Sequence, residues 1–386
     1  MSRVRINPEL IAWAMERVAD KEGLLTRFPS LSAWLSGQKL PTMRQLEAFA
    51  RATSIPFGFL LLDQPPDETT LVPLFRTISN EAASRPDASL LSCIITMQQR
   101  QEWMRGACIA AGCDPLSFVQ SASLQSDPVQ IAQHMQQTLN LSDDWSRSLP
   151  DQSSVRRCLI DAADAAGVVV VTDDMPGMAP YQPLDPTGFR GFALVDAYAP
   201  FVFLNAADDE SSQIVALIHG LAHIWVGKNA AFDLNHMRPA PEWGEIVCFQ
   251  AAAAFLLPAS DIQTAWREVR HFDDPLGHLA RTFKVHETFI AQRLVDLHVV
   301  EPQGIPLAQP SVSPRIQRRP QSSLNRMMDR LGKRFATMVV HATLSSDLLY
   351  HDAYTLTGIA GTDFDRLVSA IMHDTSPRRA SIASQR

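Results

Sequence analysis

The sequence predicts a mainly α-helical protein with one small α+β region and, at its N-terminus, a bundle of four to five short helices. Apolar residues recur at helical intervals through most of the 386-residue chain. Runs of β-branched and aromatic residues, which favour strands, are confined to residues 168–204. The segment Gln64-Pro65-Pro66 marks a linker after the first group of short helical patterns.

The composition narrows the class of protein. Hydrophobic residues make up 46% of the chain and charged residues 19%, which excludes disorder of the whole chain and allows two or three packed domains. The five cysteines are scattered and form no CxxC pair, so we expect reduced thiols in a reducing compartment. The N-terminus has no apolar signal-peptide core, and no apolar run reaches the roughly 20 residues that span a bilayer. We therefore expect a cytoplasmic protein with no membrane partner.

Changes in pattern along the chain predict its division into segments. These are a first helical domain at 1–66, a helical connector at 67–150, an α+β domain at 151–305, a Pro/Arg-rich linker at 306–322, a helical C-terminal module at 323–372 and a flexible tail at 373–386.

The α+β domain is predicted from alternating helical and strand patterns. A helix over Val155–Ala166 precedes three expected strands, Val168–Thr172, Gly191–Val195 and Pro200–Leu204. Two longer helices follow, Ser211–Gly227 and Pro241–Leu257.

The N-terminal segment reads as short helices that must share one core, because helices of this length are unstable alone. The pattern predicts helices over Pro8–Val18, Glu22–Phe28, Ser30–Ser36 and Thr42–Thr53, with Gly37 ending the third. Their candidate core residues are Trp13, Leu24, Leu25, Leu31, Trp34 and Leu46. Residues 1–62 hold eight lysines and arginines against five acids, a net charge of +3 in a chain of net charge −7. A mildly basic N-terminal unit on an acidic body suits binding to a polyanion.

The string SAWLSGQKLPTMRQLEAFA resembles the helix–Gly–turn–Pro–Thr–helix pattern of Xre/lambda-repressor helix-turn-helix domains. The resemblance implies that the third helix enters the major groove of an operator DNA. The residues then expected near DNA are Ser30, Ser32, Ala33, Ser36, Gln38 and Lys39, with Arg44 suited to a phosphate. A small helical interaction domain that no longer binds DNA is the alternative.

His219 and His223 stand four residues apart in a helical pattern, so their imidazoles project from one face. This is the spacing of the H-E-x-x-H zinc motif, in which the glutamate deprotonates zinc-bound water. Here the motif reads H-G-L-A-H, with Gly220 at the glutamate position. A third ligand must come from elsewhere, and Glu245 in the next helical pattern is the first candidate. Glu242 and His236 are the alternatives.

Several separated strings resemble the ImmA/IrrE family of zinc metallo-endopeptidases, in the large fusion type with an Xre-like N-terminal domain. They are VPLFRT at 72–77, the run from Phe189 to Gly227, and EIVCFQAAAAFLLP at 245–258. The resemblance implies a zincin-like domain with His219, His223 and Glu245 as zinc ligands. It implies no general base, because Gly220 occupies that position, and Phe249 and Ala254 also depart from the family pattern. We therefore expect no catalytic residue, while zinc binding and loss of the metal both stay open.

The C-terminal module resembles the small helical module of the large fusion members. A second helix-turn-helix-like unit, a docking surface and a cap packed on the peptidase-like domain are the alternatives, and packing is the simplest.

Three functions compete. The first is a DNA-binding regulator, the antitoxin or repressor of a toxin–antitoxin or mobile-element pair. The family resemblance implies this setting and a cognate toxin such as a PIN-like ribonuclease as partner. The second is an active zinc endopeptidase that cleaves a repressor or toxin. The third is a peptidase-like domain that binds a partner without cutting it, and we favour a combination of the first and third. A homodimer would match two-fold operator sites.

Overall fold

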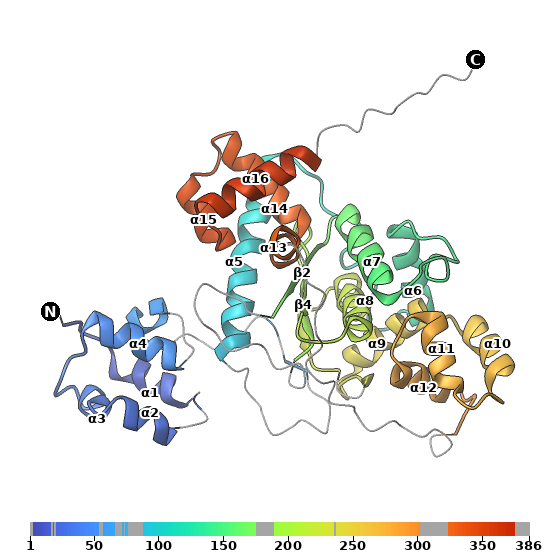
Figure 1. The fold of residues 1–386 in the computed structure, drawn as a ribbon, viewed down its shortest axis with the longest axis horizontal. Helices are drawn as coiled ribbons and strands as arrows, with labels where there is room; N and C mark the ends of the chain where they lie inside the picture. The colour runs from blue at the N-terminus through green and yellow to red at the C-terminus, as the bar shows by residue number, and fades with distance from the viewer. Residues whose placement is uncertain are drawn as a thin grey trace.

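The computed structural model describes residues 3–16, 18, 21–53, 57–65, 72, 74–75, 88–174, 189–234, 237–301 and 323–374. In these residues the chain is mostly helical and carries one mixed β-sheet, as the predicted fold class requires (Figure 1). The expected linker at 306–322 lies outside the described residues, as does the expected tail beyond residue 374. The last helix continues two residues beyond the predicted end of the C-terminal module, to Asp374.

The helices of the N-terminal unit and of the sheet-bearing part follow in chain order. They are α1 (Pro8–Glu16), α2 (Lys21–Arg27), α3 (Leu31–Leu35), α4 (Met43–Thr53), the short 3₁₀ helix η1 (Phe57–Leu61), α5 (Ala88–Ala110), α6 (Pro128–Thr138), α7 (Gln152–Ala166), α8 (Glu210–Val226), α9 (Trp243–Leu256), α10 (Ala259–Val269), α11 (Pro275–Phe283) and α12 (Glu287–Asp296). The C-terminal helices are α13 (Ser323–Leu331), α14 (Lys333–Leu344), α15 (Tyr350–Thr357) and α16 (Thr362–Asp374).

The sheet has the strand order β1-β5-β3-β4-β2 in the described residues. Its strands are β1 (Leu74–Phe75), β2 (Val169–Asp173), β3 (Gly191–Leu194), β4 (Phe201–Asn205) and β5 (Ala230–Phe232). Strand β3 runs antiparallel to both β4 and β5, whereas β2–β4 and β1–β5 are parallel pairs. The three strands predicted from the sequence are confirmed within one residue at each end. Strands β1 and β5 were not predicted, because they span only two and three residues and β5 begins with two alanines.

The two faces of the sheet are covered by different helices. Side chains alternate between faces along each strand, so Val170, Val202 and Phe232 belong to one buried cluster, and Val171 and Phe203 to the other. The first cluster is completed by α6 to α9 and by α10 to α12. The second is completed by α5 and the C-terminal helices. The C-terminal module therefore packs on the sheet, as the packing alternative predicts (Figure 1).

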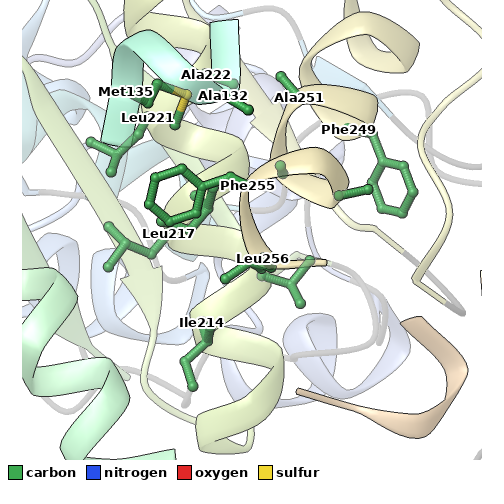
Figure 2. Close-up of a cluster of buried hydrophobic side chains, with 14 of the residues drawn as sticks. Ala132, Met135, Ile214, Leu217, Leu221, Ala222, Phe249, Ala251, Phe255 and Leu256 are labelled. Carbon is green, nitrogen blue, oxygen red and sulfur yellow. The ribbon is translucent and has the colours of Figure 1, made fainter. Parts of the chain in front are cut away.

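Helix α8 is the central element of the first cluster, and every residue from Ser211 to Val226 is buried. It begins at Asp209, whose carboxylate accepts a hydrogen bond from the backbone N–H of Ser212 at 2.9 Å. It ends at Gly227, which has a φ of 79° and adopts the left-handed conformation that favours glycine. Figure 2 shows Leu217 and Leu221 of α8 facing Phe255 of α9, in a cluster that also includes Met135 of α6. Helix α6, which falls in the expected connector, thus shares the core of the sheet-bearing part.

The N-terminal unit has a core of its own. Trp13, Leu24, Leu31, Trp34 and Leu46 are buried in it, as predicted. Leu25 is an error of the prediction, because its side chain is 46% exposed. Helix α2 has only seven residues, and the adjacent Leu24 already occupies its inward face. Gly37 has a φ of 70° and ends α3, as expected.

Helix α5 links the N-terminal unit to the rest of the protein (Figure 1). Its residue Leu91 is buried in the N-terminal core, and the partly buried Ile95 packs against the same core. Leu90, Ile94 and Met97 of the same helix lie in the sheet cluster. One long helix therefore contributes to both cores.

Among the described residues, no single helix has the length and apolar character to cross a membrane. The bent pair α9 and α10 passes that test by length and composition together, but α9 lies in the first buried cluster.

Candidate metal site

His219, His223 and Glu245 meet between α8 and α9, where all three side chains are buried. The Nε2 atoms of the two histidines are 3.1 Å apart. Glu245 places Oε2 at 3.0 Å from His219 Nε2 and Oε1 at 3.0 Å from His223 Nε2. Their donor atoms all lie within 4.8 Å of one another, which brings together the three residues that the sequence predicted as ligands.

Helix geometry explains the convergence. The histidines stand one turn apart on α8, and Glu245 lies in the first turn of α9, which packs against α8 and α6. The N-terminal end of a helix carries a partial positive charge that stabilises a carboxylate. Glu242 is the exposed N-cap of α9 and does not belong to the group. The other alternative ligand, His236, lies outside the described residues.

The donor set fits a zinc ion. Two imidazole nitrogens and one carboxylate oxygen are ligands that zinc prefers, at about 2.0–2.2 Å each. In a tetrahedral site such bonds separate neighbouring donor atoms by about 3.3 Å, close to the observed 3.0–3.1 Å. The hydrogen bonds that usually orient metal-bound histidines are missing from the described residues. His219 Nδ1 and His223 Nδ1 are buried without a hydrogen-bond partner in the described residues, whereas a metal-bound histidine usually donates its second N–H.

The electrostatics of the triad follow from its burial. Burial lowers the pKa of His219 below its usual value. Burial also acts to lower the pKa of His223, but Cys248 and Glu245 outweigh it and hold that pKa well above the usual range. Burial acts to raise the pKa of Glu245, yet His223 and His219 outweigh it and hold the pKa at about 2. The metal-free triad is therefore a buried carboxylate paired with an imidazolium, and a metal ion must displace that proton to bind.

Gly220 faces the sheet, and two side chains fill the space in front of it. A Cβ atom at this position would lie 2.9 Å from Cγ1 of Val202 on β4 and 3.6 Å from Cζ of Phe232 on β5. A contact of 2.9 Å is shorter than real Cβ atoms show, so any side chain at position 220 would force a neighbour to shift. The position where an H-E-x-x-H motif carries its general base thus has no side chain in this sequence, and Val202 and Phe232 fill the space in front of it.

Phe232 covers the histidines on the same side. Its ring meets the His219 ring edge-on at 4.6 Å between centroids and stacks on the His223 ring at 5.9 Å with an interplanar angle of 10°. Phe232 is 1% exposed. Neither Phe232 nor Val202 was recognised from the sequence. The sequence signal that could have pointed to them is the glycine of H-G-L-A-H, because a position without a side chain leaves room for neighbouring side chains to pack there.

Phe249 and Ala254, the other departures from the family pattern, contribute to packing. The ring of Phe249 meets Phe289 of α12 edge-on at 5.5 Å. Ala254 is buried in the cluster around α9. Cys248 is also buried and is one of the groups that raise the pKa of His223.

The residues expected near DNA lie on α3, on the turn after it and at the start of α4. Ser32, Ser36, Gln38, Lys39 and Arg44 are exposed, whereas Ser30 and Ala33 are partly buried. Lys39 folds back so that its Nζ donates to Ser30 Oγ at 3.0 Å and its backbone N–H to the Ala33 carbonyl at 3.0 Å.

Comparison with known proteins finds two family models, each of which matches one segment of the chain. A search of curated proteins found no match. Residues 331–370, within α13 to α16, match the model of a domain of unknown function (DUF8813). Residues 163–295, which contain His219, His223 and Glu245, match the model of the IrrE N-terminal-like domain, so this segment is a metallopeptidase-like domain of the IrrE type.

Proposed function

We propose that this chain is a DNA-binding transcriptional regulator whose metallopeptidase-like domain does not hydrolyse peptide bonds. The observation that carries the second half of the proposal is Gly220, which leaves the histidine motif without a base and has Val202 and Phe232 packed in front of it.

The chemistry of hydrolysis needs a proton acceptor beside the metal. In the intact motif the glutamate takes a proton from metal-bound water, and losing such a base typically lowers the rate by roughly 10²–10⁴-fold. Glu245 cannot take its place as a free base, because its two oxygens already lie at 3.0 Å from the two histidines.

Access supports the same conclusion. A scissile peptide bond must approach the metal, but the three ligand side chains are at most 2% exposed and the Phe232 ring stacks on one of them. A metal held there would join α8 to α9 and so would stabilise the fold. We propose that the bound metal is zinc and that it replaces the buried ion pair as the link between α8 and α9.

The N-terminal unit supports DNA binding through its shape and charge. Helix α2 is followed after a three-residue turn by α3, and both pack on a shared core. Thr42 and Gln45 cap α4 reciprocally, with Thr42 N donating to Gln45 Oε1 at 3.0 Å and Gln45 N to Thr42 Oγ1 at 3.3 Å. The exposed polar residues after α3 are then available to a duplex, and this role requires a protein that resides in the cytoplasm with the DNA.

The experiment is fluorescence anisotropy of full-length protein with a labelled duplex from the region upstream of its own gene. The proposal expects binding that a scrambled duplex of equal length and composition competes only weakly. Equal competition by the scrambled duplex, or no binding at low salt, would refute specific operator binding.

The family resemblance also suggests the setting of a toxin–antitoxin pair, in which the second partner is a cognate toxin such as a PIN-like ribonuclease. Purified neighbour-encoded protein and this chain should then form a complex that elutes as one species in size-exclusion chromatography. Two separate peaks at micromolar concentrations of both would remove this part of the proposal.

An active zinc endopeptidase is the second candidate, and the complete set of three ligands favours it. It requires the Phe232 side of the site to open and another carboxylate to act as base. Cleavage of a candidate substrate that disappears in the His219→Ala variant would establish this alternative.

A further inference from the structure

Helix α5 ends in a backbone arrangement that brings two cysteines together. Gly112 adopts a φ of 71°, the left-handed conformation that ends helices. The N–H of Cys113 donates to the carbonyl of Cys108, and the N–H of Gly112 to the carbonyl of Ile109, both at 3.0 Å. This pair of hydrogen bonds defines a Schellman motif, in which the side chains at the first and last of these positions commonly touch.

Here both of these positions are cysteine. The N···O distance of 3.0 Å between Cys113 and Cys108, combined with standard bond lengths, limits their Cα atoms to a separation of at most about 7 Å. Disulfides join Cα atoms about 4.4–6.8 Å apart. Burial raises the pKa of the Cys108 thiol above its ordinary value, and the neighbouring Cys113 is the second cause of that rise.

The two thiols differ in access. Cys113 is exposed, whereas Cys108 is 1% exposed and sits in the cluster beneath the C-terminal helices. Soluble reagents can therefore reach Cys113 first, and Cys108 lies behind it.

We propose that Cys113 and Cys108 are a redox modification site. Low-molecular-mass disulfides such as oxidised glutathione would oxidise the pair to a reversible disulfide between Cys113 and Cys108. The thiolate of Cys113 attacks one sulfur of the reagent, which gives a mixed disulfide and releases one thiolate. Cys108 then loses its proton and attacks the sulfur of Cys113, which releases the second thiolate. Protein dithiol and reagent disulfide are converted to protein disulfide and two thiols, so atoms and electrons balance.

The end of α5 and the residues just after it carry the two cysteines and contact the connection between β3 and β4. Cys108 Sγ lies 3.9 Å from the carbonyl oxygen of Tyr198, in the connection between β3 and β4. One turn earlier on α5, Arg105 pairs with Asp196 at 3.0 Å, and the N–H of Leu116 donates to the Ala197 carbonyl at 2.7 Å. A disulfide would remove the S–H that faces the Tyr198 carbonyl and would tie together the last turn of α5 beside that connection, at a site separate from the metal triad.

The test uses full-length protein incubated with oxidised glutathione, quenched with acid, alkylated and digested with trypsin. Both cysteines fall in one tryptic peptide, Gly106–Arg147, which holds no other cysteine. The expected product is this peptide with two hydrogens lost and no alkyl group added, restored by a reductant. A peptide that carries glutathione on Cys113 as the final product, or a disulfide between two protein chains, would overturn the proposal.

Two variants separate the roles of the thiols. Cys108→Ser should stop at the mixed disulfide and accumulate glutathione on Cys113, whereas Cys113→Ser should remain unmodified in this peptide. Cys158→Ser is the matched control, because Cys158 lies on α7 outside the pair, and it should form the internal disulfide like the unaltered protein. The Cys113→Ser variant has only one thiol in this peptide and cannot form the internal disulfide. If oxidised glutathione nevertheless blocks alkylation of Cys108 in that variant, Cys108 makes the first attack and the proposed order is wrong.

Discussion

The Cγ1 atom of Val202 lies 2.9 Å from the point where a Cβ at Gly220 would stand. Val202 therefore fills the space that a side chain at position 220 would enter. Restoring a glutamate at position 220 alone should not restore a peptidase site, because Val202 of β4 and Phe232 of β5 occupy the space that its side chain would need.

The Gly220→Glu substitution should destabilise the protein by about 2–4 kcal/mol, since it overpacks a filled core and buries a new carboxylate. Adding Val202→Ala should recover part of that loss, although Val202→Ala alone removes buried methyl groups and destabilises. Urea unfolding of the two single variants and the double variant measures the coupling. Strictly additive effects would show that Val202 does not close the site.

Arg100 should be a strong anchor of the C-terminal helices. It lies on α5 and donates hydrogen bonds to the carbonyls of Leu356, Arg330 and Thr357, at 3.0, 3.0 and 3.3 Å. Its guanidinium also stacks over Phe335 at 5.5 Å. Arg100→Ala should lower the free energy of unfolding by about 2–4 kcal/mol, because three carbonyls at the ends of α13 and α15 lose a charged donor.

Arg105→Ala is the control for this measurement. Arg105 lies on the same helix but its side chain is 53% exposed, and its ion pair with Asp196 is solvent-screened. We expect a cost of at most about 1 kcal/mol. Equal losses for the two variants in thermal or urea unfolding would contradict the anchoring role of Arg100.

The pair of Asp208 and Arg190 should give the stability a pH dependence. Burial raises the pKa of Asp208 to about 6 despite the neighbouring Arg190. A raised folded-state pKa stabilises the protein at low pH, and that contribution is lost as the pH rises from about 4 through 6. The stability of the unaltered protein relative to Asp208→Asn should therefore fall by about 2 kcal/mol between pH 4 and pH 7.

Urea titrations of both proteins at pH 4, 5.5 and 7 measure that difference. Asp144→Asn serves as the control, because the Asp144 side chain is 79% exposed. A difference between unaltered and Asp208→Asn protein that rises with pH would reverse the assigned direction.

Removing cations near α3 should weaken DNA binding and its dependence on salt. The double substitution Lys39→Ala and Arg44→Ala should reduce the slope of log affinity against log salt concentration by up to about 2, because each lost phosphate contact contributes about 0.9. Arg366→Ala on α16 removes another exposed arginine, which lies far along the chain, and should leave the slope unchanged. An unchanged slope in the double variant would remove these residues from the interface.

The metal-binding proposal predicts about one zinc per chain by elemental analysis after dialysis. His219→Ala should lose it, while His278→Ala, which alters an α11 histidine outside the triad, should retain it. Equal zinc content in the two variants, or none in the unaltered protein, would show that the triad holds no metal.

The parts of the structure that the sequence could predict have local signals. Each of these signals lies within a few neighbouring residues of the sequence. The spacing of His219 and His223 predicts a shared helix face, Gly227 predicts the end of α8, and the run of valines predicts β2. Glu245 could be predicted because a helix pair returns it to α8. Phe232, Val202 and the two-residue strand β1 gave no such signal, since their positions depend on pairing between segments distant in sequence.

Loss of peptidase activity can be measured by exposing zinc-loaded protein and its His219→Ala variant to a complex peptide library and identifying the new peptide ends by mass spectrometry. Because Gly220 supplies no base, we expect the same set of ends for both proteins and for the library alone. A set of cleavages made by the unaltered protein and absent with His219→Ala would show that the chain is an active peptidase.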